Sequence, residues 1–137
     1  MFINCHSHFS FKYGTLSVDA LIGEAKSKRL DAFALTDINC TAGVFPFIRA
    51  AQRVGIHPVI GIDFRNGTQQ QYIGLARNQE GFFELNSHLS EHLVHKKPFG
   101  KRAPAFDHSF IIYPLPKHFL PCGKMNTSEY TPLNSIN

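Results

Sequence analysis

Apolar positions in the first two thirds of the chain follow two alternating patterns. Short continuous apolar runs, such as residues 32–36, are typical of strands buried on both faces of a sheet. Longer segments place apolar residues three or four positions apart, which is typical of helices with one buried face. Together these patterns predict strands at residues 2–6, 32–36, 56–62, 71–76 and 110–113, and helices at residues 18–30, 41–54 and 79–94.

The order of these elements predicts an α/β fold. Strands that alternate with helices of this length indicate βαβ units and a largely parallel sheet. Ser17 stands where a helix N-cap is expected, and Gly55 follows the last residue of the second expected helix. The start of the first expected helix and the end of the second therefore agree with the apolar periodicity.

Beyond Lys96 the composition changes. Six of the eight prolines lie between Pro98 and Pro132, and no periodicity survives after Pro114. We therefore expect a folded part at residues 1–113 and a poorly ordered tail at residues 114–137.

Charge and cysteine content narrow the class of protein. The 137 residues are enough for one domain or a piece of a larger one, and the net charge is +4. The basic excess lies in residues 96–137, with six Lys or Arg against two acidic residues, so it does not argue for nucleic-acid binding by the folded part. Three cysteines at no metal-binding spacing (Cys5, Cys40 and Cys122) favour a reducing, cytoplasmic location. The lack of a signal sequence or a long apolar run predicts no membrane association.

Candidate metal ligands follow the first three expected strands. His6 and His8 follow the first, Asp37 the second and Asp63 the third. In a parallel α/β sheet these strand ends lie at one rim, and imidazole and carboxylate groups are ligands of zinc and manganese. The pattern predicts a metal site at this rim. The alternative is that the aspartates cap helices or fix turns and the histidines lie on the surface.

Three segments, residues 5–14, 34–39 and 55–64, carry a family resemblance. In this order they resemble the start of the polymerase and histidinol phosphatase (PHP) domain found at the N-terminus of bacterial replicative DNA polymerase III alpha subunits. The resemblance is closest to the Bacteroidetes version and covers about residues 1–115. It implies a distorted, seven-stranded β/α barrel, of which this chain supplies roughly the first half.

The resemblance also implies a metal centre, from which this chain departs. The His-x-His pair of metal-binding members falls at Asn4 and His6, an acidic ligand at Tyr13, and a histidine ligand at Ile38. The glutamate ligand of the third segment becomes Asp63, which keeps the charge on a shorter side chain. We therefore expect a vestigial zinc or manganese site that holds no stoichiometric metal, even if His8 substitutes in part.

The function implied by the resemblance is structural and interactive. The parent family is a DNA-directed DNA polymerase, but its polymerase aspartates would lie far downstream, so we expect the fragment to be inactive alone. The implied partners are the rest of the alpha subunit and a proofreading exonuclease subunit, with DNA contacted only indirectly. The alternatives are a free-standing PHP-type metal-dependent phosphoesterase and a non-functional gene fragment.

Two further motifs suggest structural roles. Asp37 precedes the second expected helix, so its carboxylate is expected to accept backbone N–H bonds at the start of that helix. His88, Glu91 and His92 match the H-x-x-E-H pattern of inverted zinc metalloproteases, but no further acidic ligand is evident downstream. A solvated, polar helix face is therefore the preferred interpretation of the two histidines.

The tail suggests a frameshift. If Lys124 to Thr131 are encoded by AAA ATG AAT ACA TCG GAG TAT ACG, the frame two bases forward reads Asn-Glu-Tyr-Ile-Gly-Val-Tyr. That string has the apolar run expected of a further barrel strand. The hypothesis is that a frameshift replaced the native continuation, which would leave an exposed sheet edge and a marginally stable, aggregation-prone product.

Overall fold

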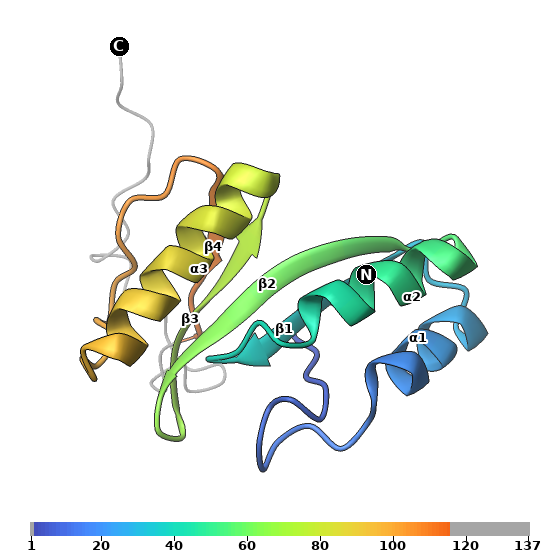
Figure 1. The fold of residues 1–137 in the computed structure, drawn as a ribbon, viewed down its shortest axis with the longest axis horizontal. Helices are drawn as coiled ribbons and strands as arrows, with labels where there is room; N and C mark the ends of the chain where they lie inside the picture. The colour runs from blue at the N-terminus through green and yellow to red at the C-terminus, as the bar shows by residue number, and fades with distance from the viewer. Residues whose placement is uncertain (1, 116–137) are drawn as a thin grey trace, which may run out of the picture.

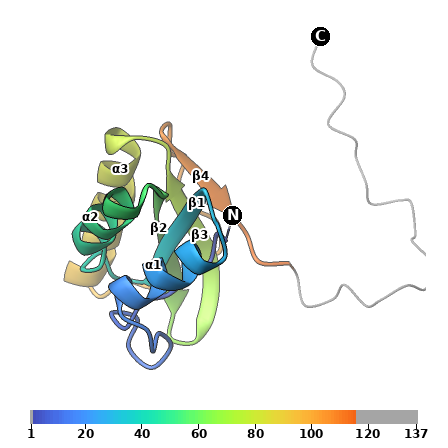
Figure 2. The same cartoon turned by 90° about the vertical axis from the view of Figure 1, so that its right-hand side faces the viewer.

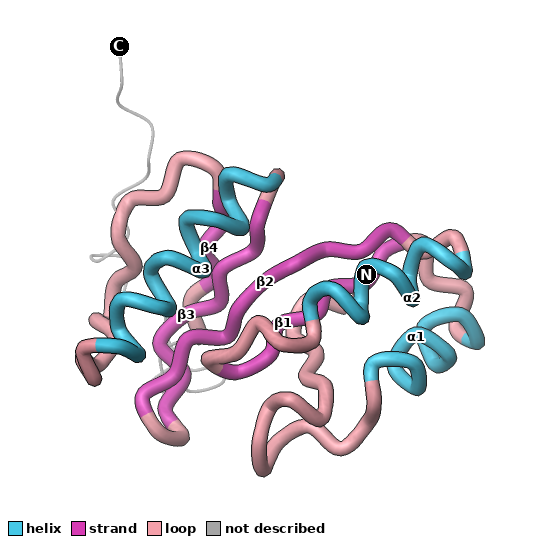
Figure 3. The backbone as a smooth tube through the Cα atoms, viewed as in Figure 1, coloured by secondary structure: helices cyan, strands magenta, loops and turns pink. Residues whose placement is uncertain are grey.

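The computed structural model describes residues 2–115, which form three helices and four strands (Figures 1 and 3). The tail expected to be poorly ordered lies, from residue 116 onward, outside the described residues. No helix within residues 2–115 is long and apolar enough to cross a membrane. In chain order the elements are α1 (Val18–Ser27), β1 (Ala32–Ile38), α2 (Val44–Val54), β2 (His57–Asn66), β3 (Gln69–Ala76), α3 (Gln79–Val94) and β4 (Ser109–Ile112).

The four strands form one sheet in the order β1-β2-β3-β4. Only β1 and β2 pair in parallel, while β2–β3 and β3–β4 are antiparallel. The expected largely parallel sheet is therefore wrong beyond the first pair. For β2 and β3 the reason is the two-residue turn at Gly67 and Thr68, with Gly67 at a φ of 58°, because a turn this short reverses the chain. The α/β class is confirmed, and the sheet formed by residues 2–115 does not close on itself, as in part of a barrel.

The first expected strand, residues 2–6, lies alongside β1 but does not form a regular ladder with it. Phe2 makes a single parallel bridge with Phe33. The Thr36 N–H donates to the Cys5 carbonyl (2.9 Å), but the Cys5 N–H donates to the Thr36 hydroxyl (3.1 Å). Because a side chain takes this bond, the backbone pairing is interrupted.

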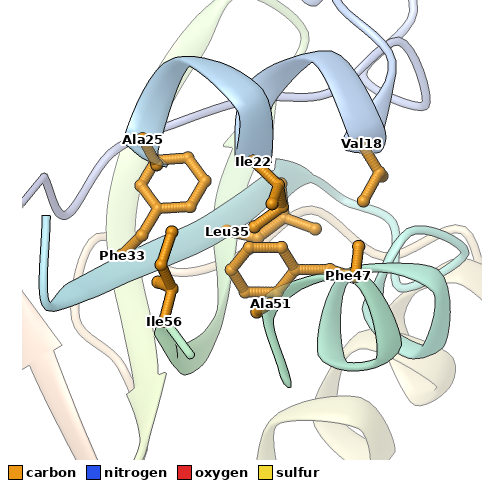
Figure 4. Packing of buried hydrophobic residues seen from close by; sticks show 9 residues of the cluster. Val18, Ile22, Ala25, Phe33, Leu35, Phe47, Ala51 and Ile56 are labelled. Carbon is orange, nitrogen blue, oxygen red and sulfur yellow. The ribbon is translucent and has the colours of Figure 1, made fainter. Parts of the chain in front are cut away.

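Helices α1 and α2 pack with β1 around one apolar core (Figure 4). The Ser17 hydroxyl accepts the Ala20 N–H (3.2 Å) and so begins α1, as the sequence predicts. Gly55 ends α2 in the left-handed conformation, also as predicted. The buried residues of this core are Val18, Ile22, Ala25, Phe33, Leu35, Phe47, Ala50, Ala51 and Ile56.

Helix α3 packs on β2 and β3 around a second, more aromatic core. Helices α2 and α3 lie on the same side of the sheet (Figure 2), so the opposite face, here called the helix-free face, carries no helix in the part of the chain that the structure describes. The buried residues of this second core are Ile62, Phe64, Tyr72, Leu85, Leu89 and Phe99.

His88 of α3 belongs to this aromatic core. It is half-buried, and its Nε2 lies 2.7 Å from the Tyr72 hydroxyl oxygen. Its ring also packs near those of Phe64 and Phe99. The expectation of a solvated histidine face is therefore wrong for His88, because the aromatic residues of β2, β3 and the loop after α3 cover it.

Candidate functional site

The two candidate aspartates lie on opposite faces of the sheet. Asp37 pairs with Ile62 across β1 and β2, and Ile38 pairs with Asp63. Paired residues on neighbouring strands point to the same face, and successive residues alternate between faces. Asp37 therefore points with Ile62 toward the helices, and Asp63 points to the helix-free face. The structure does not bring the two carboxylates together.

Asp37 is buried and fully engaged by the loop that precedes α1. Its Oδ1 accepts the Ser7 N–H (2.7 Å) and the Ser10 hydroxyl (2.6 Å), and its Oδ2 accepts the Ser7 hydroxyl (2.7 Å). Both serines are themselves fully buried. Asp37 thus has structural partners, but they lie in this loop. The sequence had predicted partners at the start of α2.

The loop anchored by Asp37 carries two side chains toward the helix-free face. Ser10 also accepts the Ile38 N–H (2.9 Å), which ties the loop to the end of β1. Gly14 packs directly against the Ser7 carbonyl, where any side chain would overlap that group. These contacts place His6 at one end of the loop and Tyr13 at the other.

His6, Asp63 and Arg65 form a charged cluster on the helix-free face. His6 Nε2 lies 3.1 Å from Asp63 Oδ2, and Arg65 donates to the same oxygen from Nε (2.9 Å) and Nη2 (2.8 Å). The Asp63 side chain is completely buried, and the other two are 16% (His6) and 13% (Arg65) exposed. Asp63 Oδ1 is buried and has no hydrogen-bond partner among the described residues. The sequence predicted the first two members of this cluster, and Arg65 was missed.

The hydrogen bonds and charges of the cluster favour an ionised Asp63 beside a protonated Arg65. Burial alone would raise the pKa of Asp63, but the hydrogen bonds from His6 and Arg65 outweigh it, so this pKa lies below its ordinary value. Burial would likewise lower the pKa of Arg65, but the hydrogen bond and the charge of Asp63 raise it. Gln70 also favours the Asp63 carboxylate, although its amide Nε2 makes no hydrogen bond of ordinary geometry. Asp63 and Arg65 therefore carry opposite charges.

Two features aim Arg65 at Asp63. The two residues are two positions apart on β2, so they share a face. The bulge in the β2–β3 pairing at this point places its extra residue, Gln71, on β3 and leaves the alternation of β2 intact. Asn39 clamps the Arg65 backbone, accepting its N–H (2.9 Å) and donating to its carbonyl (2.8 Å). The Asp-x-Arg spacing on a strand was the only signal in the sequence.

The remaining candidates are engaged elsewhere. His8 is exposed, and its ring lies against Phe9 with centroids 4.3 Å apart. The Asn4 side-chain carbonyl accepts the Thr36 hydroxyl (3.3 Å). His8 makes no contact with His6 or Asp63 among the hydrogen bonds and ring contacts of residues 2–115.

The donor set does not fit zinc or manganese. Within residues 2–115 no three His, Cys, Asp or Glu side chains are grouped so that they could hold a metal ion. Asp63 Oδ2 is occupied by Arg65 and His6, and the oxygens of Asp37 by serines. A guanidinium beside a carboxylate also opposes the approach of a second cation.

Comparisons of sequence place these observations in a family context. Residues 3–117 match the PHP domain family. The chain is 37% identical over 85 residues to the DNA polymerase III subunit alpha of Ureaplasma parvum, and 37% identical over 84 residues to the error-prone DNA polymerase of Symbiobacterium thermophilum. Each match covers 61% of this chain and 8% of the relative. The chain thus spans less than a tenth of the length of these curated relatives.

Solved structures show the same fold. An amidohydrolase from Chromobacterium violaceum, solved with bound sulfate and no metal, has 26% identity and a TM-score of 0.54, over 69% of this chain and 33% of that one. A metal-dependent phosphoesterase homologue from Bifidobacterium adolescentis has 21% identity and a TM-score of 0.50, over 68% of this chain and 31% of that one. At this identity the second likeness concerns the fold alone.

Proposed function

Because the chain belongs to the PHP domain family, we propose that it forms the N-terminal PHP region of a DNA polymerase III alpha subunit, with a structural and interactive role. The similarity to named polymerase subunits supports this assignment. Polymerase chemistry would reside elsewhere in such a subunit, since the chain corresponds to 8% of those relatives.

The contact that carries the non-hydrolytic part of the proposal is the one between Asp63 and Arg65. A metal hydrolase needs a cation that activates water and keeps an open coordination position. Here the Asp63 oxygen that faces His6 accepts two N–H groups of Arg65. The chain's own side chains therefore occupy the position where such a cation would be needed.

The interactive part of the proposal concerns the edge of the sheet. Strand β4 pairs only with β3 among the described residues, so its other edge is free there to pair with a further strand. Phe110 on β4 is 60% exposed, and Tyr113 just after it is half exposed. We propose that further strands of the alpha subunit cover this edge, and that a proofreading exonuclease subunit is a second partner. DNA would then be contacted only indirectly.

The competing function is a free-standing metal-dependent phosphoesterase, and an activity assay separates the two. The 137-residue chain is incubated with bis(p-nitrophenyl) phosphate and either manganese or zinc. We expect no hydrolysis above that of the metal alone. Hydrolysis that Asp63→Asn abolishes, and that the exposed control Asp31→Asn leaves unchanged, would contradict the proposal and establish the phosphoesterase.

A binding measurement tests the interactive role directly. The 137-residue chain is mixed with the Ureaplasma parvum alpha subunit from which the matching 85 residues have been deleted. We expect the two to elute together in size-exclusion chromatography. Separate elution, with both proteins folded, would count against the proposed partner.

A further inference from the structure

Two residues that depart from the metal-binding pattern, Tyr13 and Asp63, contact one guanidinium. We infer that Arg65 is a built-in cation that takes the place of a divalent metal ion beside Asp63 and thereby makes the site independent of metal. The inference goes beyond the proposed function, because it concerns what holds the site together in this chain.

Arg65 balances the charge of a buried carboxylate. The Asp63 side chain has no exposed surface, and a buried carboxylate is strongly unfavourable unless a partner compensates it. Arg65 provides that partner with two N–H groups on one oxygen. Because a guanidinium stays protonated at all physiological pH values, this compensation is permanent, as that of a resident metal ion would be.

Separate elements fix the guanidinium in place. Its central carbon lies 4.9 Å from the centre of the Tyr13 ring, within the range of a cation–π contact. Tyr13 stands at the position where the family resemblance implies an acidic metal ligand. The Asn39 side chain holds the Arg65 backbone through two hydrogen bonds. Tyr13, Asn39 and Arg65 thus come from three segments of the chain and serve one contact.

The second oxygen of the Asp63 carboxylate is unused within residues 2–115. Neither this oxygen, Oδ1, nor the nearby Gln70 Nε2 has a hydrogen-bond partner in this part of the chain, and both are buried. With Arg65 in place, its positive charge opposes a metal ion at this oxygen. Without that charge, His6 and Asp63 would offer an imidazole nitrogen and a carboxylate to a cation. The cluster is therefore a latent metal site that Arg65 keeps closed.

Thermal unfolding of the 137-residue chain tests this inference. Arg65→Gln keeps a hydrogen-bond donor and removes the charge, whereas Arg65→Lys keeps the charge. Each variant is measured in EDTA and then in excess manganese or zinc chloride. The matched control is Arg53→Gln, an arginine on α2 that is 72% exposed.

Only the loss of charge at Arg65 is expected to create a response to metal. For Arg65→Gln we expect a lower Tm in EDTA and a rise of roughly 5 °C or more with metal, because an ion that binds only the folded state stabilises it. The wild type, Arg65→Lys and Arg53→Gln should shift by less than about 1 °C. Adding Asp63→Asn to Arg65→Gln should abolish the response.

The remaining outcomes are equally decisive. A metal response in the wild type, or none in a folded Arg65→Gln, overturns the inference. If Arg65→Gln does not fold in either buffer, the double variant Asp63→Asn/Arg65→Gln decides. Its folding supports charge compensation by Arg65, and its failure to fold refutes it. These readouts are independent of hydrolysis and of partner binding, so this inference and the proposed function can fail separately.

Discussion

At the scale of single residues, the two buried carboxylates, Asp37 and Asp63, have separate sets of partners. Ser7 and Ser10 bind Asp37 on the helix side of β1. His6 and Arg65 bind Asp63 on the other face. Each carboxylate is therefore stabilised by its own set of hydrogen-bond donors, and the two do not share a site.

Replacing Asp37 by Ala should be strongly destabilising. The substitution removes three short hydrogen bonds and leaves the O–H donors of two buried serines without their acceptor. Hydrogen bonds to a charged group contribute about 1.5–3 kcal/mol each, and they are not additive, so we expect a loss of about 3 kcal/mol. Urea unfolding of the wild type and of the variant measures this loss of stability. The exposed control Asp31→Ala should cost less than about 0.5 kcal/mol. A loss below about 1 kcal/mol for Asp37→Ala, the size of an ordinary helix cap, would show that the loop does not depend on this carboxylate.

At the scale of elements, the contact between β3 and α3 depends on a tyrosine–histidine pair. The Tyr72 hydroxyl lies 2.7 Å from His88 Nε2. Burial, together with the nearby Tyr113, raises the pKa of Tyr72 to about 12. Burial and the neighbouring His92 lower the pKa of His88, and Glu91 opposes this only in part. Both side chains are therefore held neutral in the folded protein.

This pair predicts a loss of stability at both ends of the pH range. In the unfolded chain Tyr72 ionises near pH 10, so its contribution is complete below pH 10 and disappears as the pH rises toward 12. Unfolded His88 takes up a proton near pH 6.5, so stability falls as the pH drops below that value. We expect the ionisation of Tyr72 alone to lower the free energy of unfolding by about 1 kcal/mol between pH 9 and pH 11.

Urea unfolding across this range checks the prediction. Tyr72→Phe should have a shallower alkaline loss than the wild type, and His88→Phe a shallower acidic one. Tyr72→Phe should also be less stable at neutral pH by about 1 kcal/mol, because one hydrogen bond is lost. Identical pH profiles for wild type and both variants would show that the pair does not titrate as the packing implies.

At the scale of the whole molecule, the sheet ends in a strand with a free edge among the described residues. Strand β4 has one neighbour, and Phe110 projects from it with 60% of its surface exposed. Its ring makes a cation–π contact with Arg77, whose guanidinium carbon lies 5.3 Å from the ring centre. An unpaired strand edge with apolar side chains promotes association with other chains.

The 137-residue chain is therefore expected to associate as its concentration rises. Light scattering coupled to size-exclusion chromatography should show an increasing mass for the wild type. Phe110→Lys should reduce it, because a charge on an edge strand opposes pairing. Phe83→Lys is the matched control, since Phe83 is 72% exposed but lies on α3 and not on the edge strand β4. A monomer at every concentration would contradict both the prediction and the expected instability of the chain.

The sequence by itself determined what depends on neighbouring residues. Helix α3 spans Gln79–Val94, the range that the apolar spacing predicts, and α1 begins after Ser17 as its capping side chain indicates. These features rest on contacts within a few positions of the chain, which periodicity reports directly. The motif resemblance also identified the family, because ordered short motifs are a property of the sequence alone.

Only the tertiary structure decided how the charged groups are partnered. Asp37 and Asp63 follow similar apolar runs, but the register of β1 and β2 places them on opposite faces. A register shift of one residue reverses the face, and in runs that are apolar on both faces the alternation that would specify the register is absent. Arg65 could not be predicted as a site residue because its partners are distant in the sequence. Asn39 and Tyr13, which hold it, lie 26 or more positions away and contact it only when the sheet and the loop have formed.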